Sequence, residues 1–403
     1  MNAITIKTGL LATVCSFFMI SCGDDSLNFE VPDTYSFERN GVSTVAFSGQ
    51  TTRIAMATEL VAAMTDFSNV TKESLMEMFD NQTAAGTDAD PYMDEALNAS
   101  TKSIHSKIAA SADFFSANTV ESAEIKADFK TWITAQIEEV KANQSTIAQP
   151  GVAGQIADGN TARYISGDGL EYNQAVGKAL IGALMVDQIC NHYLSPAVLD
   201  AGNNIADNDN NLNEEGQLYT SMEHKWDEAY GYLYGAASDV SLPLANLSED
   251  DFLSKYLTRV DEDEDFNGIA QEIFDAYKTG RAAIVAGDYV TRDKQAEIIK
   301  EDISEVIAIR AVYYLQSAKT ALQSGQMGSA FHDLSEGYGF IYSLRFTRQA
   351  NSNASYFTKD EVENFIAQLT SGNGFWDVQT ETLDEISKDI ADKFTFTIEE
   401  TVK

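Results

Sequence analysis

The chain contains the stretch His332-Asp-Leu-Ser-Glu-Gly-Tyr-Gly-Phe-Ile-Tyr-Ser343, which matches an earlier stretch, His224-Lys-Trp-Asp-Glu-Ala-Tyr-Gly-Tyr-Leu-Tyr-Gly235. Five of the twelve positions are identical, and four more carry residues of the same kind. The whole chain has only four histidines, and two of them begin these stretches. The match therefore indicates two related units within one chain.

Helical geometry gives both stretches the same shape. Residues at i, i+4, i+7 and i+11 of an α-helix lie on one stripe of its surface. In each stretch this stripe carries a His, a Glu and two small residues: His224, Glu228, Gly231 and Gly235 in the first, and His332, Glu336, Gly339 and Ser343 in the second. Small residues allow another helix or a ligand to approach closely, so we expect both stripes to face a neighbour.

Apolar residues recur at helical spacing along most of the remaining sequence. In 126–141, for example, Phe129, Ile133, Ile137 and Val140 share one face. The pattern predicts helices from Arg53 onward and near 92–116, 119–146, 170–195, 212–238, 264–286, 291–324, 328–347, 359–370 and 375–393. The five prolines fall at the edges of these segments, as helices require.

We therefore expect an all-α fold, a helical bundle assembly with two pseudo-repeated halves at roughly 52–245 and 246–393. Both halves belong to a single large helical domain, 35–403, which begins with a short extended segment or hairpin at 35–50. The ending Phe394–Glu400 alternates in polarity, which predicts a short strand.

The beginning of the chain has the features of an export signal. Residues 1–21 combine one positive charge with an apolar run that is too short to span a bilayer, and Cys22 follows directly. We expect a signal peptide, lipidation at Cys22 and a polar tether over 22–34. Together with Asp24-Asp25, this predicts an outer-membrane lipoprotein that faces the periplasm or the cell surface. Secretion with cleavage nearby is the alternative.

Composition excludes several classes of protein. A formal net charge of −35 disfavours nucleic acid as a partner, because its phosphates need Lys and Arg. With 44% hydrophobic residues, general disorder is excluded. The lipid is the only membrane contact that we expect, and protein partners are not indicated. Cys190 is left without a disulfide partner, and we expect a buried, inert thiol there.

The repeated His and Glu predict a metal site. If the two helices face each other, His224, Glu228, His332 and Glu336 could bind one iron, zinc or other divalent ion. Three further polar residues could hydrogen-bond to the ligands of such a site without binding the metal themselves: Glu171, Gln174 and Asp187. A metal-binding module, with a role in metal uptake, is the leading hypothesis, and iron or zinc is the only cofactor it implies.

Other interpretations stay open. A His–Glu pair one helical turn apart can instead be a hydrogen-bonded pair that fixes helix packing, in a structural or interaction lipoprotein. The stripe could also belong to a pocket for an organic ligand or carbohydrate. The spacing is not that of a zincin, which needs two histidines on one helix. No catalytic signature is present, so a non-enzymatic role is favoured over a hydrolase.

Four segments carry a resemblance to a known family: Val31–Arg39, Phe47–Arg53, Trp226–Tyr232 and His332–Phe340. They resemble the hallmarks of DUF4856, a group of Bacteroidetes-type lipoproteins known only as a domain of unknown function. The resemblance covers nearly the whole mature chain and implies that the chain forms a single domain of this family. More remotely, the chain is similar to imelysin-like proteins, exported helical proteins with pseudo-repeated bundles that are often tied to iron uptake. Their hallmark is a Gly-x-His-x-x-Glu motif, and the resemblance implies that His224 with Glu228 and His332 with Glu336 stand in its place. Here the spacing is one residue longer and the preceding Gly is absent.

Overall fold

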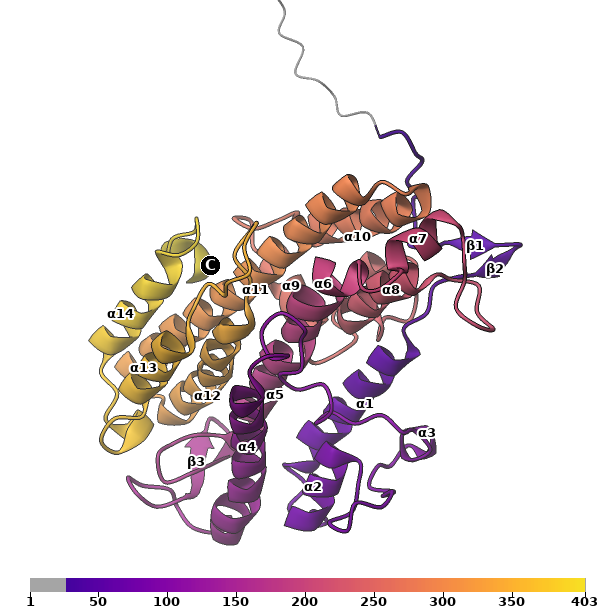
Figure 1. Ribbon diagram of the computed structural model, residues 1–403. Helices are drawn as coiled ribbons and strands as arrows, with labels where there is room; N and C mark the ends of the chain where they lie inside the picture. The colour runs from indigo at the N-terminus through magenta and orange to yellow at the C-terminus, as the bar shows by residue number, and fades with distance from the viewer. Residues whose placement is uncertain (1–26, 403) are drawn as a thin grey trace, which may run out of the picture. The chain divides into compact units, whose positions relative to one another are not determined.

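The computed structural model describes residues 27–402, in which nearly all regular structure is helical. The α-helices are α1 (Ser48–Ala63), α2 (Lys72–Asp80), α3 (Glu95–Asn98), α4 (Thr119–Ala135), α5 (Tyr172–Leu180), α6 (Pro196–Leu199), α7 (Asn204–Asp209), α8 (Ser221–Tyr234), α9 (Leu253–Asp261), α10 (Ile269–Ala286), α11 (Tyr289–Gln323), α12 (Met327–Ser343), α13 (Lys359–Leu369) and α14 (Thr380–Ala391). Figure 1 shows their arrangement. The prediction of an all-α fold is confirmed.

Shorter elements complete the chain. Two-stranded antiparallel hairpins are formed by β1 (Glu38–Arg39) with β2 (Val42–Ser43), and by β3 (Gly154–Asp158) with β4 (Thr161–Ile165). Three π-helical segments, η1 (Gln136–Val140), η3 (Ile181–Val186) and η4 (Ile189–Tyr193), extend α4 and α5. The remaining short helices are 3-10 turns: η2 (Lys141–Asn143), η5 (Pro243–Asn246), η6 (Leu344–Phe346), η7 (Gly374–Trp376) and η8 (Glu399–Val402). The chain divides into two units, Met1–Glu30 and Val31–Lys403, and every element named here belongs to the second.

Helix α11 is the longest element, and α10, α12 and α14 all pack along it. Gly287 has a φ of +73°, a conformation that only glycine adopts freely, and it lets the chain leave α10 and turn into α11. Asp288 then caps α11, because its Oδ1 accepts a hydrogen bond from the Thr291 backbone N–H at 3.0 Å. Helix α12 in turn packs on α5, which connects this half of the unit to the earlier helices.

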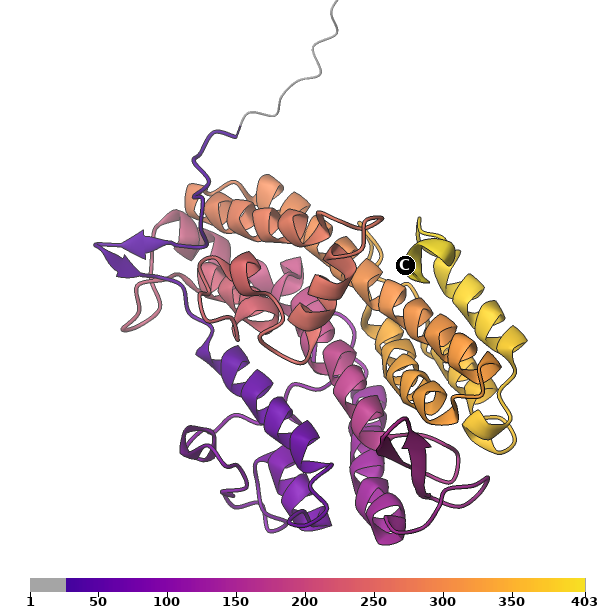
Figure 2. The same cartoon turned by 180° about the vertical axis from the view of Figure 1, so that it is seen from behind.

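The hairpin of β3 and β4 packs against the first turn of α12, and Figure 2 shows it from the side opposite to Figure 1. The Ser329 hydroxyl donates to Asp158 Oδ1 at 2.6 Å, and Gly328 lies so close to the Ala157 carbonyl that a Cβ there would be 2.2 Å from its oxygen. The sequence pattern predicts no element between the helices at 119–146 and 170–195. The two strands pair with each other, and their contacts with α12, which lies far away in sequence, fix the hairpin on the helices.

Two predicted elements are wrong. The helix expected at 92–116 is reduced to α3, because side chains from elsewhere take the hydrogen bonds of this segment: Asn81 Nδ2, for example, donates to the Ser100 and Lys102 carbonyls at 2.7 and 2.8 Å. The strand expected at 394–400 is a turn that leads into η8, where Glu400 Oε2 accepts from the Thr397 backbone N–H at 2.6 Å. The division into two pseudo-repeated halves stays a prediction.

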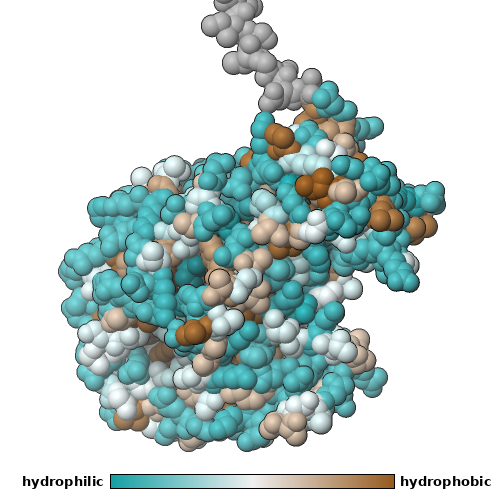
Figure 3. Space-filling model, viewed as in Figure 1, coloured by the Kyte–Doolittle hydropathy of each residue, from teal (hydrophilic) through white to brown (hydrophobic). Residues whose placement is uncertain are grey.

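The surface in Figure 3 is mostly hydrophilic, with scattered apolar residues, as expected for a chain of such high net charge. Among the described residues, no helix is both long and apolar enough to cross a bilayer.

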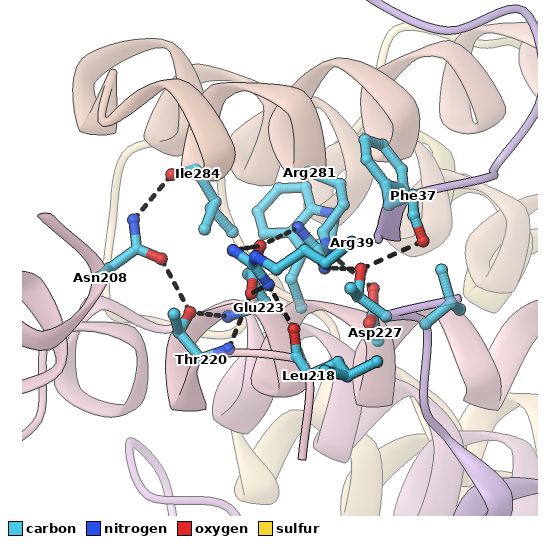
Figure 4. Close-up of polar contacts among 12 residues, drawn as sticks. Phe37, Arg39, Asn208, Leu218, Thr220, Glu223, Asp227, Arg281 and Ile284 are labelled. Carbon is cyan, nitrogen blue, oxygen red and sulfur yellow. Dashed lines mark hydrogen bonds and ion pairs between the residues drawn. The ribbon is translucent and has the colours of Figure 1, made fainter. Parts of the chain in front are cut away.

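A buried ion network joins α8 and α10 (Figure 4). Arg281 of α10 is fully buried and donates to Glu223 Oε1 at 2.8 Å and to Asp227 Oδ1 at 3.0 Å. Its third nitrogen donates to the Thr44 hydroxyl at 3.1 Å. One guanidinium therefore satisfies two buried carboxylates that lie one turn apart on α8.

The same carboxylates fix the N-terminal hairpin on the helices. Arg39, which ends β1, donates to Glu223 through both terminal nitrogens, at 2.6 and 2.9 Å. Tyr35 donates its hydroxyl to Asp227 Oδ1 at 2.6 Å, and the Ala46 backbone N–H donates to Oδ2 at 3.3 Å. The extended segment predicted at the start of the domain is thus attached by charge and hydrogen bonds as well as by apolar contact.

Replacing Arg281 by Met should lower the free energy of unfolding by about 3–5 kcal/mol, because Glu223 and Asp227 lose their buried partner. Chemical denaturation measures this change. The control is Lys388→Met, which removes one positive charge from an exposed site and should shift stability by no more than about 0.5 kcal/mol. Equal effects of the two substitutions would contradict the role given to Arg281.

Candidate functional site

The second His–Glu pair lies on α12 and faces α5. His332 Nδ1 is 3.2 Å from Oε1 of Glu171, the residue that precedes α5. One turn further along α12, Glu336 Oε1 is 3.0 Å from Nζ of Lys178, which lies on α5. Lys178 also donates to Gln174 Oε1 at 3.2 Å. Two of the supporting residues predicted from sequence, Glu171 and Gln174, therefore do contact this pair or its partner.

Glu336 is held as a carboxylate in a buried position. Burial raises its pKa, but the charges of Lys178 and His332, with hydrogen bonds from Tyr314 and Lys178, lower the pKa more, so the net shift is downward. The Tyr256 hydroxyl lies 3.5 Å from Glu336 Oε1. The carboxylate is thus surrounded by donors and stays ionised at neutral pH.

Burial lowers the pKa of His332, whereas the hydrogen bond and charge of Glu171 and the charge of Glu336 raise it, and the net shift is upward. The imidazole is therefore charged over a wider pH range than a free histidine. It forms an ion pair with Glu171 when protonated.

These residues line a pocket of about 760 Å³. Side chains from α1, β4, α5, α9, α11 and α12 form its wall. The polar part includes His332, Glu336, Glu171, Gln174, Lys178 and Asn173. The aromatic part includes Tyr256, Tyr313, Tyr314, Tyr164, Phe67 and Phe252. The pocket thus combines fixed charged groups with several flat apolar surfaces, a composition typical of small-molecule sites.

The first His–Glu pair lies on α8 and does not line this pocket. Glu228 Oε1 accepts from Gln50 Nε2 at 3.0 Å and from the Tyr193 hydroxyl at 3.1 Å. Its other oxygen accepts from Lys225 at 2.7 Å. His224 Nδ1 is 3.6 Å from Glu214 Oε2 and makes no hydrogen bond. This pair has its own set of partners, separate from that of the second pair.

The four side chains therefore do not form the shared metal site that the sequence suggested. Glu228 and Glu336 each hold a lysine ammonium, at 2.7 and 3.0 Å, where a divalent ion would need to bind. Within residues 27–402, no group of three or more His, Cys, Asp or Glu side chains could hold a metal ion. The residues present do not fit a four-ligand iron or zinc centre, and metal binding stays a prediction.

The small residues of both stripes serve close packing, as predicted. A Cβ on Gly231 of α8 would lie 2.4 Å from the Cβ of Phe47, just before α1. A Cβ on Gly339 of α12 would lie 2.5 Å from the Cβ of Lys178 on α5. Ser343 continues the second contact, since its hydroxyl donates to the Lys178 carbonyl at 2.9 Å and accepts from the Gly182 N–H at 3.1 Å. Each repeated helix thus presents the same stripe to a preceding part of the chain.

The other residues singled out from sequence lie elsewhere. Asp187 is fully buried and accepts from the Ala110 and Ser111 backbone N–H groups at 3.0 and 3.1 Å. Burial raises the pKa of Asp187 to about 6, and the residue holds a loop instead of supporting the pocket. Burial also raises the pKa of Cys190 to about 12, which makes the thiol inert as expected. Cys22 lies outside the described residues.

Sequence reasoning missed the partners that make the pocket, among them Lys178, Tyr256 and Tyr314. Lys178 could have been found, because it is the one charged residue in the apolar run Ala175–Leu184. A charged residue in such a run needs a partner, and the structure shows that Lys178 is buried. The two tyrosines had none, since they come from α9 and α11 and meet α12 only in the folded chain.

Comparison with known proteins assigns a family but no activity. A family model described as a domain of unknown function (DUF4856) matches residues 32–397, nearly the whole chain. No curated protein and no solved structure matches the chain.

Replacing Gly339 by Ala should lower the free energy of unfolding by about 1–3 kcal/mol, because the new methyl group collides with α5 at Lys178 and Ala175. Thermal and urea unfolding measure this loss. Gly337→Ala is the matched control on the same helix: its nearest neighbour would be 3.4 Å away, and alanine favours the helix by up to about 1 kcal/mol. A destabilised Gly337→Ala with an unaffected Gly339→Ala would contradict the close contact.

The His332–Glu171 pair should make stability depend on pH in a defined direction. The folded-state pKa of His332 is raised, so its contribution is fully present below the ordinary value of 6.5 and is lost as pH rises through the folded pKa. His332→Gln should therefore cost more stability at pH 5 than at pH 9. Urea unfolding of both proteins at these pH values checks this, and a cost that grows with pH would refute it.

Proposed function

We infer that this chain, which belongs to the DUF4856 family, is an exported binding protein that takes a small polar organic ligand into the pocket at His332 and Glu336. The observation that carries the proposal is the pocket itself. Its volume of about 760 Å³ falls within the usual range for ligand sites, roughly 300–1,000 Å³. One of the two repeated His–Glu pairs lines it, whereas the other is occupied by contacts within the protein.

A carbohydrate is the ligand class that this lining fits best. A sugar ring presents hydroxyl groups around its edge and an apolar C–H surface on its faces. Lys178, Glu336 and Gln174 offer fixed donors and acceptors for hydroxyl groups, and charge-assisted bonds of this kind are the stronger ones. Tyr256 and Tyr314 offer flat surfaces for the C–H faces.

The ion pairs favour binding over catalysis. Glu336 is kept ionised by Lys178 and His332, so it cannot act as an acid at neutral pH. Glu171 is likewise engaged by His332. Each of these ionised groups is paired with another, an arrangement that orients a ligand.

The location and metal content belong to the same proposal. The signal at 1–21 and Cys22 support an outer-membrane lipoprotein anchored by lipid, with the binding unit in the periplasm or at the cell surface. Iron or zinc binding at the His–Glu pairs is kept as a separate prediction, and the lysines on both glutamates argue against it.

Calorimetric titration of the full chain, extracted from the membrane fraction with detergent, tests the binding proposal. Galactose, N-acetylglucosamine and galacturonic acid are suitable probes. We expect at least one to bind, and Glu336→Gln to weaken that binding by about 10-fold or more, because a charge-assisted hydrogen bond is lost. Mass spectrometry of the same samples measures bound iron and zinc.

Glu228→Gln is the matched control, because Glu228 holds the same place in the other repeat and does not line the pocket. It should leave sugar affinity unchanged. Equal losses in Glu228→Gln and Glu336→Gln, or no binding of any sugar by the parent chain, would count against the proposal. Stoichiometric metal in the parent that is lost in His332→Ala would replace it with the metal-binding function.

A further inference from the structure

Tyr256, Tyr313 and Tyr314 form one side of the pocket, the tyrosine wall. A buried arginine without a hydrogen-bond or ion-pair partner lies behind it. Arg310 of α11 is only 4% exposed, and its Nε and Nη2 atoms make no hydrogen bond. Its guanidinium lies 4.0 Å from the ring centre of Tyr313, 4.8 Å from that of Tyr314 and 5.5 Å from that of Tyr256. Among the described residues Arg310 forms no ion pair. An unsatisfied buried cation is costly, so this arrangement needs an explanation.

Arg310 faces a smaller hollow of about 390 Å³ that adjoins the pocket. Arg259 and Tyr313 line both spaces, so the two adjoin at these side chains. Arg259 is exposed, lies over the ring of Tyr256 at 5.8 Å and makes no ion pair within residues 27–402. Two unpaired guanidinium groups therefore line the smaller hollow, and one of them, that of Arg259, also lines the pocket.

The acidic groups nearby do not neutralise these arginines. In the pocket, Glu336 pairs with Lys178, Glu171 with His332, and Asp251 with Lys255. The fourth acidic residue of the lining, Asp333, accepts a hydrogen bond from the Ser317 hydroxyl at 2.7 Å. In the smaller hollow, Glu262 and Asp263 are present, but neither forms an ion pair with Arg259 or Arg310 in this part of the chain. The carboxylates of the pocket are thus engaged, and the charges left unmatched at the junction are positive. This is unusual in a chain with 62 acidic and 27 basic residues.

We propose that Arg310 and Arg259 bind the acidic group of a carbohydrate whose ring occupies the pocket, so that the ligand class is an acidic sugar carrying a carboxylate or a sulfate. This rests on the proposed function, which supplies the ring site. A guanidinium presents parallel N–H donors that match either oxyanion, and the surrounding tyrosine rings stabilise the arginines until the anion arrives. Binding gives the unpaired guanidinium groups an anionic partner.

Titrations with matched sugars test this inference. Galactose, galacturonic acid and galactose 6-sulfate share a ring and differ in the acidic group. We expect the full chain in detergent to bind one or both acidic sugars at least about 10-fold more tightly than galactose, and the preference to weaken as salt concentration rises. The acid that is preferred identifies carboxylate or sulfate as the natural group.

Arg310→Met should abolish this preference while galactose affinity stays within about 2-fold of the parent. Arg310→Lys keeps the charge but not the paired donors and should retain part of the preference. Arg259→Met should weaken it, and Lys388→Met, which removes an equal charge from an exposed site, should not change it. If Arg310→Met does not fold, the Arg310→Lys and Arg259→Met variants decide the question. A preference that survives these substitutions overturns the inference.

Inorganic sulfate separates the two proposals. It should raise the melting temperature of the parent chain saturably, compared with sodium chloride of equal ionic strength, and this effect should disappear in Arg310→Met. Sugars that bind parent and Arg310→Met alike, without a sulfate effect, would leave the pocket function standing and refute the acidic subsite. A sulfate effect that needs Arg310, with no sugar binding at all, would support the anion site and refute the carbohydrate pocket.

Discussion

The contact between α5 and α12 sets the geometry of the candidate site. Gly339 allows the two backbones to approach so closely that a Cβ there would lie 2.5 Å from the Lys178 Cβ and 2.9 Å from the Ala175 carbonyl oxygen. Ser343 fixes their register through hydrogen bonds with Gly182 and Lys178. At this separation the Lys178 ammonium reaches Glu336, and Glu171 at the start of α5 reaches His332. A larger residue at the contact would force the helices apart, and ion pairs of about 3 Å tolerate little displacement. The polar part of the pocket is therefore a consequence of close helix packing.

The buried network around Arg281 provides the same kind of constraint elsewhere in the unit. Its two carboxylates lie on α8, on the helix that carries the first repeat, but on a neighbouring face. The second repeat has Phe331 and Ser335 at the corresponding positions, so the network has no counterpart on α12. The two copies have thus acquired different surroundings: α8 anchors the N-terminal hairpin, and α12 faces a pocket.

Charge distribution supports this difference in roles. The chain is strongly acidic, and most of its basic side chains are engaged in ion pairs with carboxylates. Arg310 and Arg259 depart from this rule at the tyrosine wall, where burial or stacking replaces a carboxylate partner. A strongly acidic chain with such a pocket repels most anions at its surface and still attracts one at the arginines, because the local field there has the opposite sign.

The sequence by itself determined the helical class, the repeated stripes and the expectation of a buried, inert Cys190, because these depend on local periodicity and composition. Apolar spacing located α10, α11, α12 and α13 closely, and the small residues of the stripes correctly indicated close contacts. It failed at 92–116, where the Asn81 side chain binds the Ser100 and Lys102 carbonyls, and at the hairpin of β3 and β4, where Asp158 binds Ser329 of α12.

Only the tertiary structure decided which polar residues meet. Sequence spacing placed His332 beside Glu336, yet it could not show that Lys178 occupies the position of the expected metal or that Glu228 is satisfied by Gln50 and Tyr193. Nor could it show that Arg310 lacks a partner, since the absence of a contact is a property of the whole fold. Local sequence determines which residues share one face of a helix. Which residues pack against that face depends on contacts between segments more than a hundred residues apart.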